Sequence, residues 1–121
     1  MCGTVLIVED DSIIALELQF ILADAGAEVV GPACSVDEAL DLVEDGRPSA
    51  AVLDVRLAGE DISPVASALH RRHIPFVFYS GQVETDATMR GWPGAPYVAK
   101  PAPSRVLVAA IRDLAKGKVP H

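Results

Sequence analysis

The stretch TVLIVEDD, residues 4–11, joins a short apolar run to three consecutive acidic residues. Similar apolar runs recur along the chain, and each has the length of a β-strand rather than of a helix. The runs lie at Thr4–Val8, Glu28–Val30, Ala50–Leu53, Phe76–Tyr79 and Pro96–Ala99, and the second is the weakest. Because they show little polar alternation, they are typical of strands that are buried on both faces of a sheet.

Segments with helical spacing lie between these runs. Their start signals include a capping box at Ser35 and Glu38, and a serine cap before a proline at Ser63-Pro64. Glycines follow the apolar faces as stop signals. The expected helices run from Ile14 to Ala25, from Ser35 to about Asp45, from Ser63 to Arg72, and from near Ser104 to a C-cap at Gly117. A further short helix of about two turns has room near residues 85–90, before a segment rich in glycine and proline.

Apolar strands that alternate with amphipathic helices predict a parallel sheet, because parallel strands need crossover helices that cover both sheet faces. The expected fold class is α/β, a three-layer, doubly wound sandwich. A length of 121 residues fits one domain over residues 1–121, with no room for an added output domain.

Composition excludes several classes of function. The net charge of -7 disfavours nucleic-acid binding, since Arg71-Arg72 is the only basic cluster of note. No apolar stretch approaches the ~20 residues that cross a bilayer, and no secretion leader opens the chain, so we expect a cytoplasmic protein without a membrane contact. Cys2 and Cys34 have neither disulfide-framework nor zinc-site spacing and are expected to be free thiols.

Polar residues follow four of the expected strands, at the sheet edge where open α/β folds bind ligands. They are Glu9-Asp10-Asp11, Asp54, Ser80-Gly81 and Lys100. Each has a structural alternative: Asp11 or Ser12 can cap a helix, and aspartate and Ser-Gly are common in turns. Their convergence on one edge favours a functional site.

The charges at this edge indicate which chemistry it performs. Glu9, Asp10 and Asp54 repel one another at neutral pH unless their pKa values rise or a cation binds. Oxygen ligands suit Mg²⁺ or Mn²⁺, and Mg²⁺ commonly bridges a few carboxylates to a phosphate. An aspartate nucleophile would form an acyl phosphate, with Lys100 neutralising charge and Ser80 donating a hydrogen bond.

The motifs VEDD (8–11), LD (53–54), YSG (79–81) and YVAKP (97–101) resemble, in order and spacing, those of response-regulator receiver domains. The resemblance covers nearly the whole chain and implies a five-stranded, flavodoxin-like (CheY-like) sheet of strand order 2-1-3-4-5. It also implies that Asp54 is the phosphoacceptor. Asp10, Asp54 and the Arg56 backbone carbonyl would ligate Mg²⁺, with Glu9 acting through water, and Lys100 would pair with the phosphoryl group.

The same resemblance implies a signalling role and partners. A histidine kinase or phosphotransfer protein would supply the phosphoryl group, and the domain would catalyse only its own phosphorylation and dephosphorylation, so it is not a turnover enzyme. Ser80 and Tyr97 would switch, reporting phosphorylation to a protein partner on the fourth-helix to fifth-helix face. A cis Lys100-Pro101 bond is also implied.

Residues 75–81, PFVFYSG, resemble a narrower group, the stand-alone receivers of alphaproteobacterial stress and light signalling. Ala102 departs from the usual phenylalanine after Lys100-Pro101, and the weak fourth helix departs from the usual output surface. Both departures affect partner geometry rather than phosphorylation.

Three other functions fit the sequence less well. An aspartyl-phosphate phosphatase of the haloacid-dehalogenase type needs a second aspartate two residues after the nucleophile, where Arg56 stands. A binding module without phosphorylation would not need the complete set of pocket residues. A dinucleotide-binding domain would need a glycine loop after the first strand.

Several conspicuous side chains are expected to be structural. His70 and His73 lie near a helix end, where positive charge is favourable. Trp92 is expected to anchor a loop, and Tyr79 to lie in the sheet core.

Overall fold

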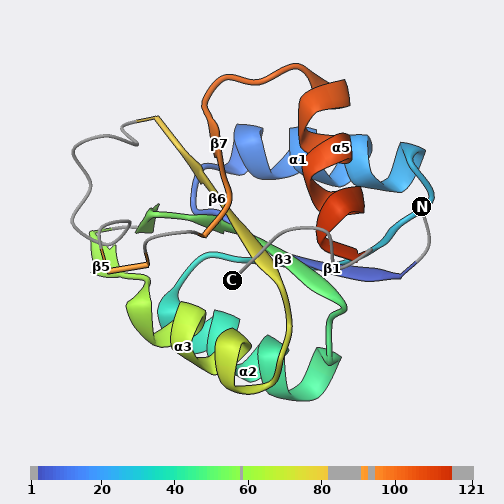
Figure 1. The fold of residues 1–121 in the computed structure, drawn as a ribbon. Coiled ribbons are helices and arrows are strands. Elements are labelled where there is room, and N and C mark those ends of the chain that lie inside the picture. The colour runs from blue at the N-terminus through green and yellow to red at the C-terminus, as the bar shows by residue number, and fades with distance from the viewer. Residues whose placement is uncertain (1–2, 58, 82–90, 93–94, 116–121) are drawn as a thin grey trace.

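Parallel strands form the central sheet in the computed structural model, which describes residues 3–57, 59–81, 91–92 and 95–115 (Figure 1). Its five strands lie in the order β2-β1-β3-β6-β7. They are β1 (Thr4–Val8), β2 (Glu28–Ala33), β3 (Ala50–Asp54), β6 (Phe76–Ser80) and β7 (Tyr97–Ala99). Counted along the sheet strands alone, this is the expected order 2-1-3-4-5, with every pair parallel.

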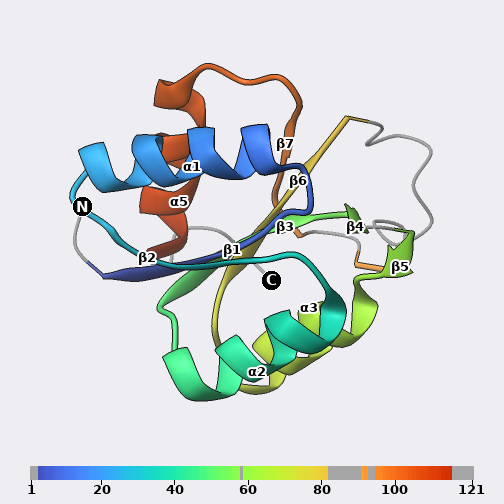
Figure 2. The ribbon, with the colours of Figure 1, turned by 180° about the vertical axis from the view of Figure 1, so that it is seen from behind.

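Helices cover both faces of this sheet, as Figures 1 and 2 show from opposite sides. Helices α1 (Ser12–Asp24) and α5 (Ser104–Ala115) lie on one face. Helices α2 (Val36–Gly46) and α3 (Ser63–Arg71) lie on the other. The predicted doubly wound, three-layer sandwich is therefore confirmed.

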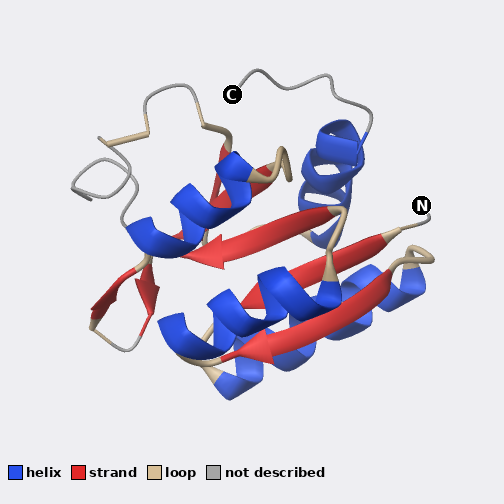
Figure 3. Ribbon diagram, turned by 90° about the horizontal axis from the view of Figure 1, so that it is seen from below, coloured by secondary structure: helices blue, strands red, loops and turns tan. Residues whose placement is uncertain are grey.

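Side-chain alternation along each strand divides the core into two clusters. On β6, Phe76 and Phe78 pack toward α2 and α3, whereas Val77 and Tyr79 pack toward α1 and α5. Both faces of the strand are buried, which explains why its sequence is almost continuously apolar. The parallel strands point toward one edge of the sheet, visible in Figure 3 by their arrowheads.

The ends of several elements differ from the sequence prediction. Strand β2 continues three residues beyond Val30, to Ala33, where the Glu9 N–H donates to the Ala33 carbonyl at 3.0 Å. Strand β7 begins at Tyr97 rather than at Pro96. The prediction of a short helix at residues 85–90 and of a cap at Gly117 lies outside the described residues.

The helix caps were only partly predicted. Ser35 caps α2 by accepting from the Glu38 N–H at 3.2 Å, but the Glu38 carboxylate accepts from Cys34 rather than from Ser35. The helix includes Gly46, and Arg47 takes the left-handed conformation after it, with φ 42°. The prediction that Ser63 caps α3 is wrong by one residue: Ile62 is the cap residue, and Asp61 accepts from the Ser63 N–H.

A small antiparallel hairpin follows β3 and was not predicted. It pairs β4 (Arg56–Leu57) with β5 (Glu60–Asp61), and Gly59 between them has a φ of 78°, which glycine tolerates. The Glu60 carboxylate accepts from the Val36 N–H at 3.2 Å, so the hairpin is tied to the start of α2.

Two further features complete the fold. The expected cis bond at Lys100-Pro101 is present, and a second, unpredicted cis bond lies at Gly31-Pro32. Among the described helices, none is both long enough and apolar enough to span a membrane.

The buried ring of Phe78 provides a test of the packing. Phe78 is fully buried and meets Phe76 edge to face at 5.5 Å, so Phe78→Ala should lower the free energy of unfolding by about 3–5 kcal/mol in urea denaturation. The matched control is Phe20→Ala, whose ring is 68% exposed on α1. Equal losses for the two variants would contradict the assigned core.

Candidate functional site

The carboxyl ends of β1, β3, β6 and β7 meet at one open cleft of about 460 Å³. The structure therefore brings together the polar residues that the sequence placed at this edge. The cleft is lined by Glu9, Asp10, Asp11, Ile14, Asp54, Ser80, Gly81 and Lys100. Ile14, which the sequence placed only on a helix face, reaches the cleft because α1 starts directly beside it.

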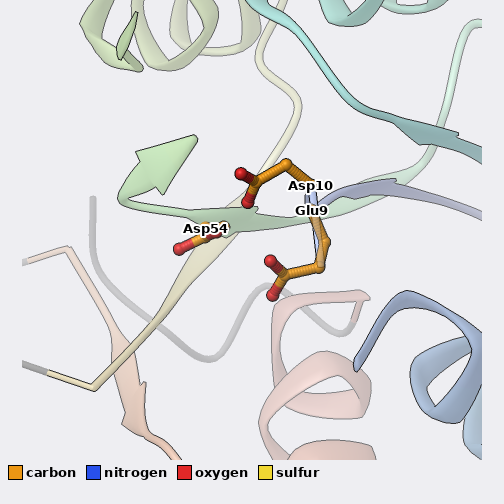
Figure 4. Close-up of side chains that lie close together, drawn as sticks. All are labelled: Glu9, Asp10 and Asp54. Atoms are coloured by element: carbon orange, nitrogen blue, oxygen red, sulfur yellow. The ribbon is translucent and has the colours of Figure 1, made fainter. Parts of the chain in front are cut away.

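Three carboxylates crowd together in this cleft (Figure 4). One oxygen each from Glu9, Asp10 and Asp54 lies within 4.8 Å of the others. Glu9 and Asp54 are buried, whereas Asp10 is exposed. Such a set of hard oxygen donors, close together and partly shielded from water, fits a divalent cation such as Mg²⁺ or Mn²⁺.

Lys100 offsets part of this negative charge. Its Nζ lies 2.8 Å from Glu9 Oε1 and 3.4 Å from Asp54 Oδ1. Burial alone would lower the pKa of Lys100, but the hydrogen bond to Glu9 and the charges of Asp54 and Glu9 outweigh burial and raise it. Lys100 is therefore protonated at neutral pH and contributes a positive charge to the cleft.

Glu9 is the most perturbed carboxyl group of the cleft. Burial, followed by a hydrogen bond with Asp54, raises the pKa of Glu9 from 4.5 to about 7, although Lys100 opposes the rise. Its Oε2 also accepts from the Asp11 N–H at 3.3 Å. The family resemblance implied that Glu9 acts through water, and no sequence signal revealed its direct contact with Lys100.

The three acidic residues after β1, Glu9, Asp10 and Asp11, have different roles. Asp11 Oδ1 accepts from the N–H groups of Ile13 and Ile14, at 2.9 and 3.2 Å. Asp11 is thus the N-cap of α1, the structural alternative that the sequence left open. Within this run, Glu9 and Asp10 are the residues that join Asp54 in the carboxylate cluster.

The remaining predicted site residues are Ser80, Gly81, Arg56 and Tyr97, and the structure gives the position of each. Ser80 is buried at the end of β6, and a Cβ on Gly81 would meet no atom within 4 Å, so the chain leaves space beside it. Arg56 begins β4, two residues after Asp54. Tyr97 is 57% exposed on β7.

Residues expected to be structural do pack in that way. Trp92 meets Phe76 and His70 edge to face, each at 5.6 Å, and packs against the core, so it anchors its loop. Tyr79 is buried in the sheet core. Cys34 is an exposed free thiol.

Comparison with known proteins identifies the family. The family model of the response regulator receiver domain matches residues 5–112. The chain belongs to this receiver family. Receiver domains are signalling modules of two-component systems, in which phosphorylation on aspartate is typical.

Individual receivers of known sequence or structure support the assignment. The transcriptional regulatory protein PdtaR of Mycobacterium tuberculosis is 31% identical over 110 residues, covering 88% of this chain and 54% of that protein. The DNA-binding transcriptional activator DevR/DosR of the same organism is 36% identical over 121 residues, covering 94% and 55%. The chain thus spans about half the length of these relatives.

Solved receiver structures match over nearly their whole length. The signal receiver domain of a modulated diguanylate cyclase from Desulfovibrio desulfuricans G20 has a TM-score of 0.86 and 29% identity, covering 98% of this chain and 97% of that one. A response regulator receiver protein from Sinorhizobium medicae WSM419 has a TM-score of 0.84 and 26% identity, covering 97% of both chains.

The raised pKa of Glu9 predicts how stability depends on pH without metal. Because the folded-state pKa of about 7 exceeds 4.5, the folded protein holds this proton more tightly. The resulting stability is complete below pH 4.5 and is lost as the pH rises through 7, by up to about 3 kcal/mol. In urea denaturation with a chelator, Glu9→Gln should flatten this decline.

The matched control is Glu28→Gln, an exposed carboxyl group at the start of β2. It should retain the pH dependence of the unsubstituted protein. Parallel curves for Glu9→Gln and the unsubstituted protein would show that burial of Glu9 does not cause the decline.

Proposed function

We propose that the protein accepts a phosphoryl group on Asp54 with the help of Mg²⁺, and so acts as the phosphoacceptor of a two-component phosphorelay. The observation that carries this proposal is the position of the Asp54 carboxylate. It is buried at the end of β3, 3.4 Å from the Lys100 ammonium and within 4.8 Å of the carboxylates of Glu9 and Asp10. A carboxylate that can act as the nucleophile, two further carboxylates that can hold a cation, and a positive charge would thus act in one cleft.

The chain's own groups would each have a task in the transfer. An Asp54 oxygen attacks phosphorus while the bond to the donor, a phosphohistidine nitrogen, breaks. Asp10, Asp54 and the Arg56 backbone carbonyl would hold Mg²⁺ or Mn²⁺, with Glu9 contributing through water. When bound, this ion neutralises charge on the phosphoryl oxygens.

Lys100 and Ser80 would stabilise the product. The Lys100 ammonium already faces Asp54 and can pair with a phosphoryl oxygen of the acyl phosphate. The Ser80 hydroxyl, from the end of the neighbouring strand, can donate to another. These groups act on the protein's own Asp54, so the protein would catalyse its own phosphorylation and would not turn over a separate substrate.

Phosphorylation would then be reported through Ser80 and Tyr97. Ser80 would shift toward the phosphoryl group, and Tyr97, now exposed on β7, would turn inward. This would be a two-state population shift, read by a protein partner on the expected fourth-helix to fifth-helix face. The expected fourth helix, residues 85–90, lies outside the described residues.

The phosphodonor would be a histidine kinase or a histidine phosphotransfer protein. Ile13, Leu16 and Phe20 are large, exposed apolar side chains on α1, which starts at the cleft, and such side chains support a protein donor. We propose that this receiver acts in the cytoplasm, without a membrane or nucleic-acid contact of its own. The net charge of -7 supports the absence of a nucleic-acid contact. DNA binding is named for the relative DevR/DosR and is not proposed for this chain.

Intact mass spectrometry after incubation with acetyl phosphate and Mg²⁺ tests the acceptor. The unsubstituted protein should gain one phosphoryl group, about 80 Da, and Asp54→Asn should gain none, because an amide is not a nucleophile for this transfer. Asp37→Asn, at an exposed aspartate in the first turn of α2, is the matched control and should label normally.

Other outcomes point to other functions. Full labelling of Asp54→Asn would refute Asp54 as the acceptor. No labelling of a folded, unsubstituted protein would favour a receiver-like interaction module that works without phosphorylation.

A further inference from the structure

We infer that Tyr79 is a positioning residue for Lys100, holding its ammonium group where it faces Glu9 and Asp54. This inference rests on the proposed function, since it assigns Tyr79 a part in the phosphoryl transfer. Tyr79 itself touches no reacting atom and would act only through the lysine.

The contact between the two side chains is a cation–π arrangement. Lys100 Nζ lies 5.3 Å from the centroid of the Tyr79 ring, inside the range of about 6 Å in which a ring attracts a cation. The ring is 6% exposed, and the lysine side chain 18%. Because water is largely excluded, the attraction is stronger than it would be on the surface.

The backbone fixes the ring more firmly than the lysine. Tyr79 lies within β6, pairs with Val98 of β7, and packs in the core cluster beneath α1 and α5. Lys100 follows β7 and carries its charge on a flexible, four-carbon stem. The immobile ring can therefore restrict the mobile ammonium group.

The carboxylate partners of Lys100 are not constant through the reaction. Glu9 and Asp54 attract the ammonium group at 2.8 and 3.4 Å. A bound cation would compete for these carboxylates, and phosphorylation would convert the Asp54 carboxylate into an acyl phosphate, a mixed anhydride. The Tyr79 ring is the neighbour whose attraction stays the same in each state.

An alternative place for the ammonium group lies beside the pair. A small cavity of about 80 Å³ is lined by Glu17 of α1 together with Ile14, Tyr79 and Lys100. The Glu17 carboxylate would attract a lysine that left the cleft. A smaller side chain at position 79 would enlarge this cavity and release the lysine toward it.

The ring, rather than the hydroxyl group, is the part that acts. The Lys100 ammonium group lies over the ring, 5.3 Å from its centroid. Phenylalanine keeps the ring and should preserve the contact, whereas leucine keeps an apolar core residue but removes the aromatic face. Tyr79→Phe and Tyr79→Leu are therefore a matched pair.

The test measures the labelling rate with acetyl phosphate and Mg²⁺ by intact mass. Tyr79→Leu should label about threefold to tenfold more slowly than the unsubstituted protein, and Tyr79→Phe at nearly the full rate. In a Lys100→Ala background, Tyr79→Leu should cause no further slowing. A purely structural role would slow labelling by the same factor in both backgrounds.

A second readout reports the contact without any activity. In NMR spectra of protein with ¹³C-labelled lysine, the Tyr79 ring should shift the Lys100 ε-methylene protons upfield. This shift should persist in Tyr79→Phe and vanish in Tyr79→Leu, and its absence from the unsubstituted protein would overturn the inference.

The outcomes separate this inference from the proposed function. If the unsubstituted protein labels and Tyr79→Leu labels equally fast, the positioning role is wrong and the phosphoacceptor function stands. If the unsubstituted protein does not label at all, the proposed function fails, and the positioning role fails with it even where the NMR contact is seen.

Discussion

The gathering of the Glu9, Asp10 and Asp54 carboxylates within 4.8 Å of one another is the constraint on which the rest of the structure depends. It follows from the topology, because parallel strands deliver their carboxyl ends to one edge of the sheet. Like charges at this distance repel, most strongly where burial removes water. The single cationic side chain that lines the cleft, among the described residues, is Lys100, and it offsets only part of the charge. The site is therefore electrostatically incomplete without a cation.

This incompleteness links the fold to signalling. A cation that binds the carboxylates relieves repulsion and at the same time provides a place for phosphoryl oxygens. Lys100 contributes the second positive charge, and the Tyr79 ring gives that charge a fixed position. In the proposed function, phosphorylation would redistribute the contacts around Asp54, and the ends of β6 and β7 would pass the change to the surface. Family membership supports this order of events, since aspartate phosphorylation is typical of receivers.

Sequence patterns predicted the sheet, its strand order and the convergence of the site residues, because each depends on burial over several residues. The patterns did not predict features that depend on one side-chain contact, such as helix caps and ion pairs. Ser63 was expected to cap α3, but Asp61 of the unpredicted β4–β5 hairpin accepts its N–H. The Glu38 carboxylate accepts a hydrogen bond from the Cys34 N–H, not from the Ser35 N–H that a capping box requires. Likewise the direct ion pair of Glu9 with Lys100 joins residues far apart in sequence, and only the folded register brings them together.

The central claim is that crowded carboxylates make this cleft a cation site, and isothermal titration calorimetry with Mg²⁺ tests it most directly. The account predicts one saturable site in the unsubstituted protein, weakened about tenfold or more in Asp10→Asn and unchanged in Asp37→Asn. Asp10 is the informative position because it is exposed, so its substitution leaves the core intact. Equal Mg²⁺ affinity in Asp10→Asn and in the unsubstituted protein, or no saturable binding by either, would contradict the account.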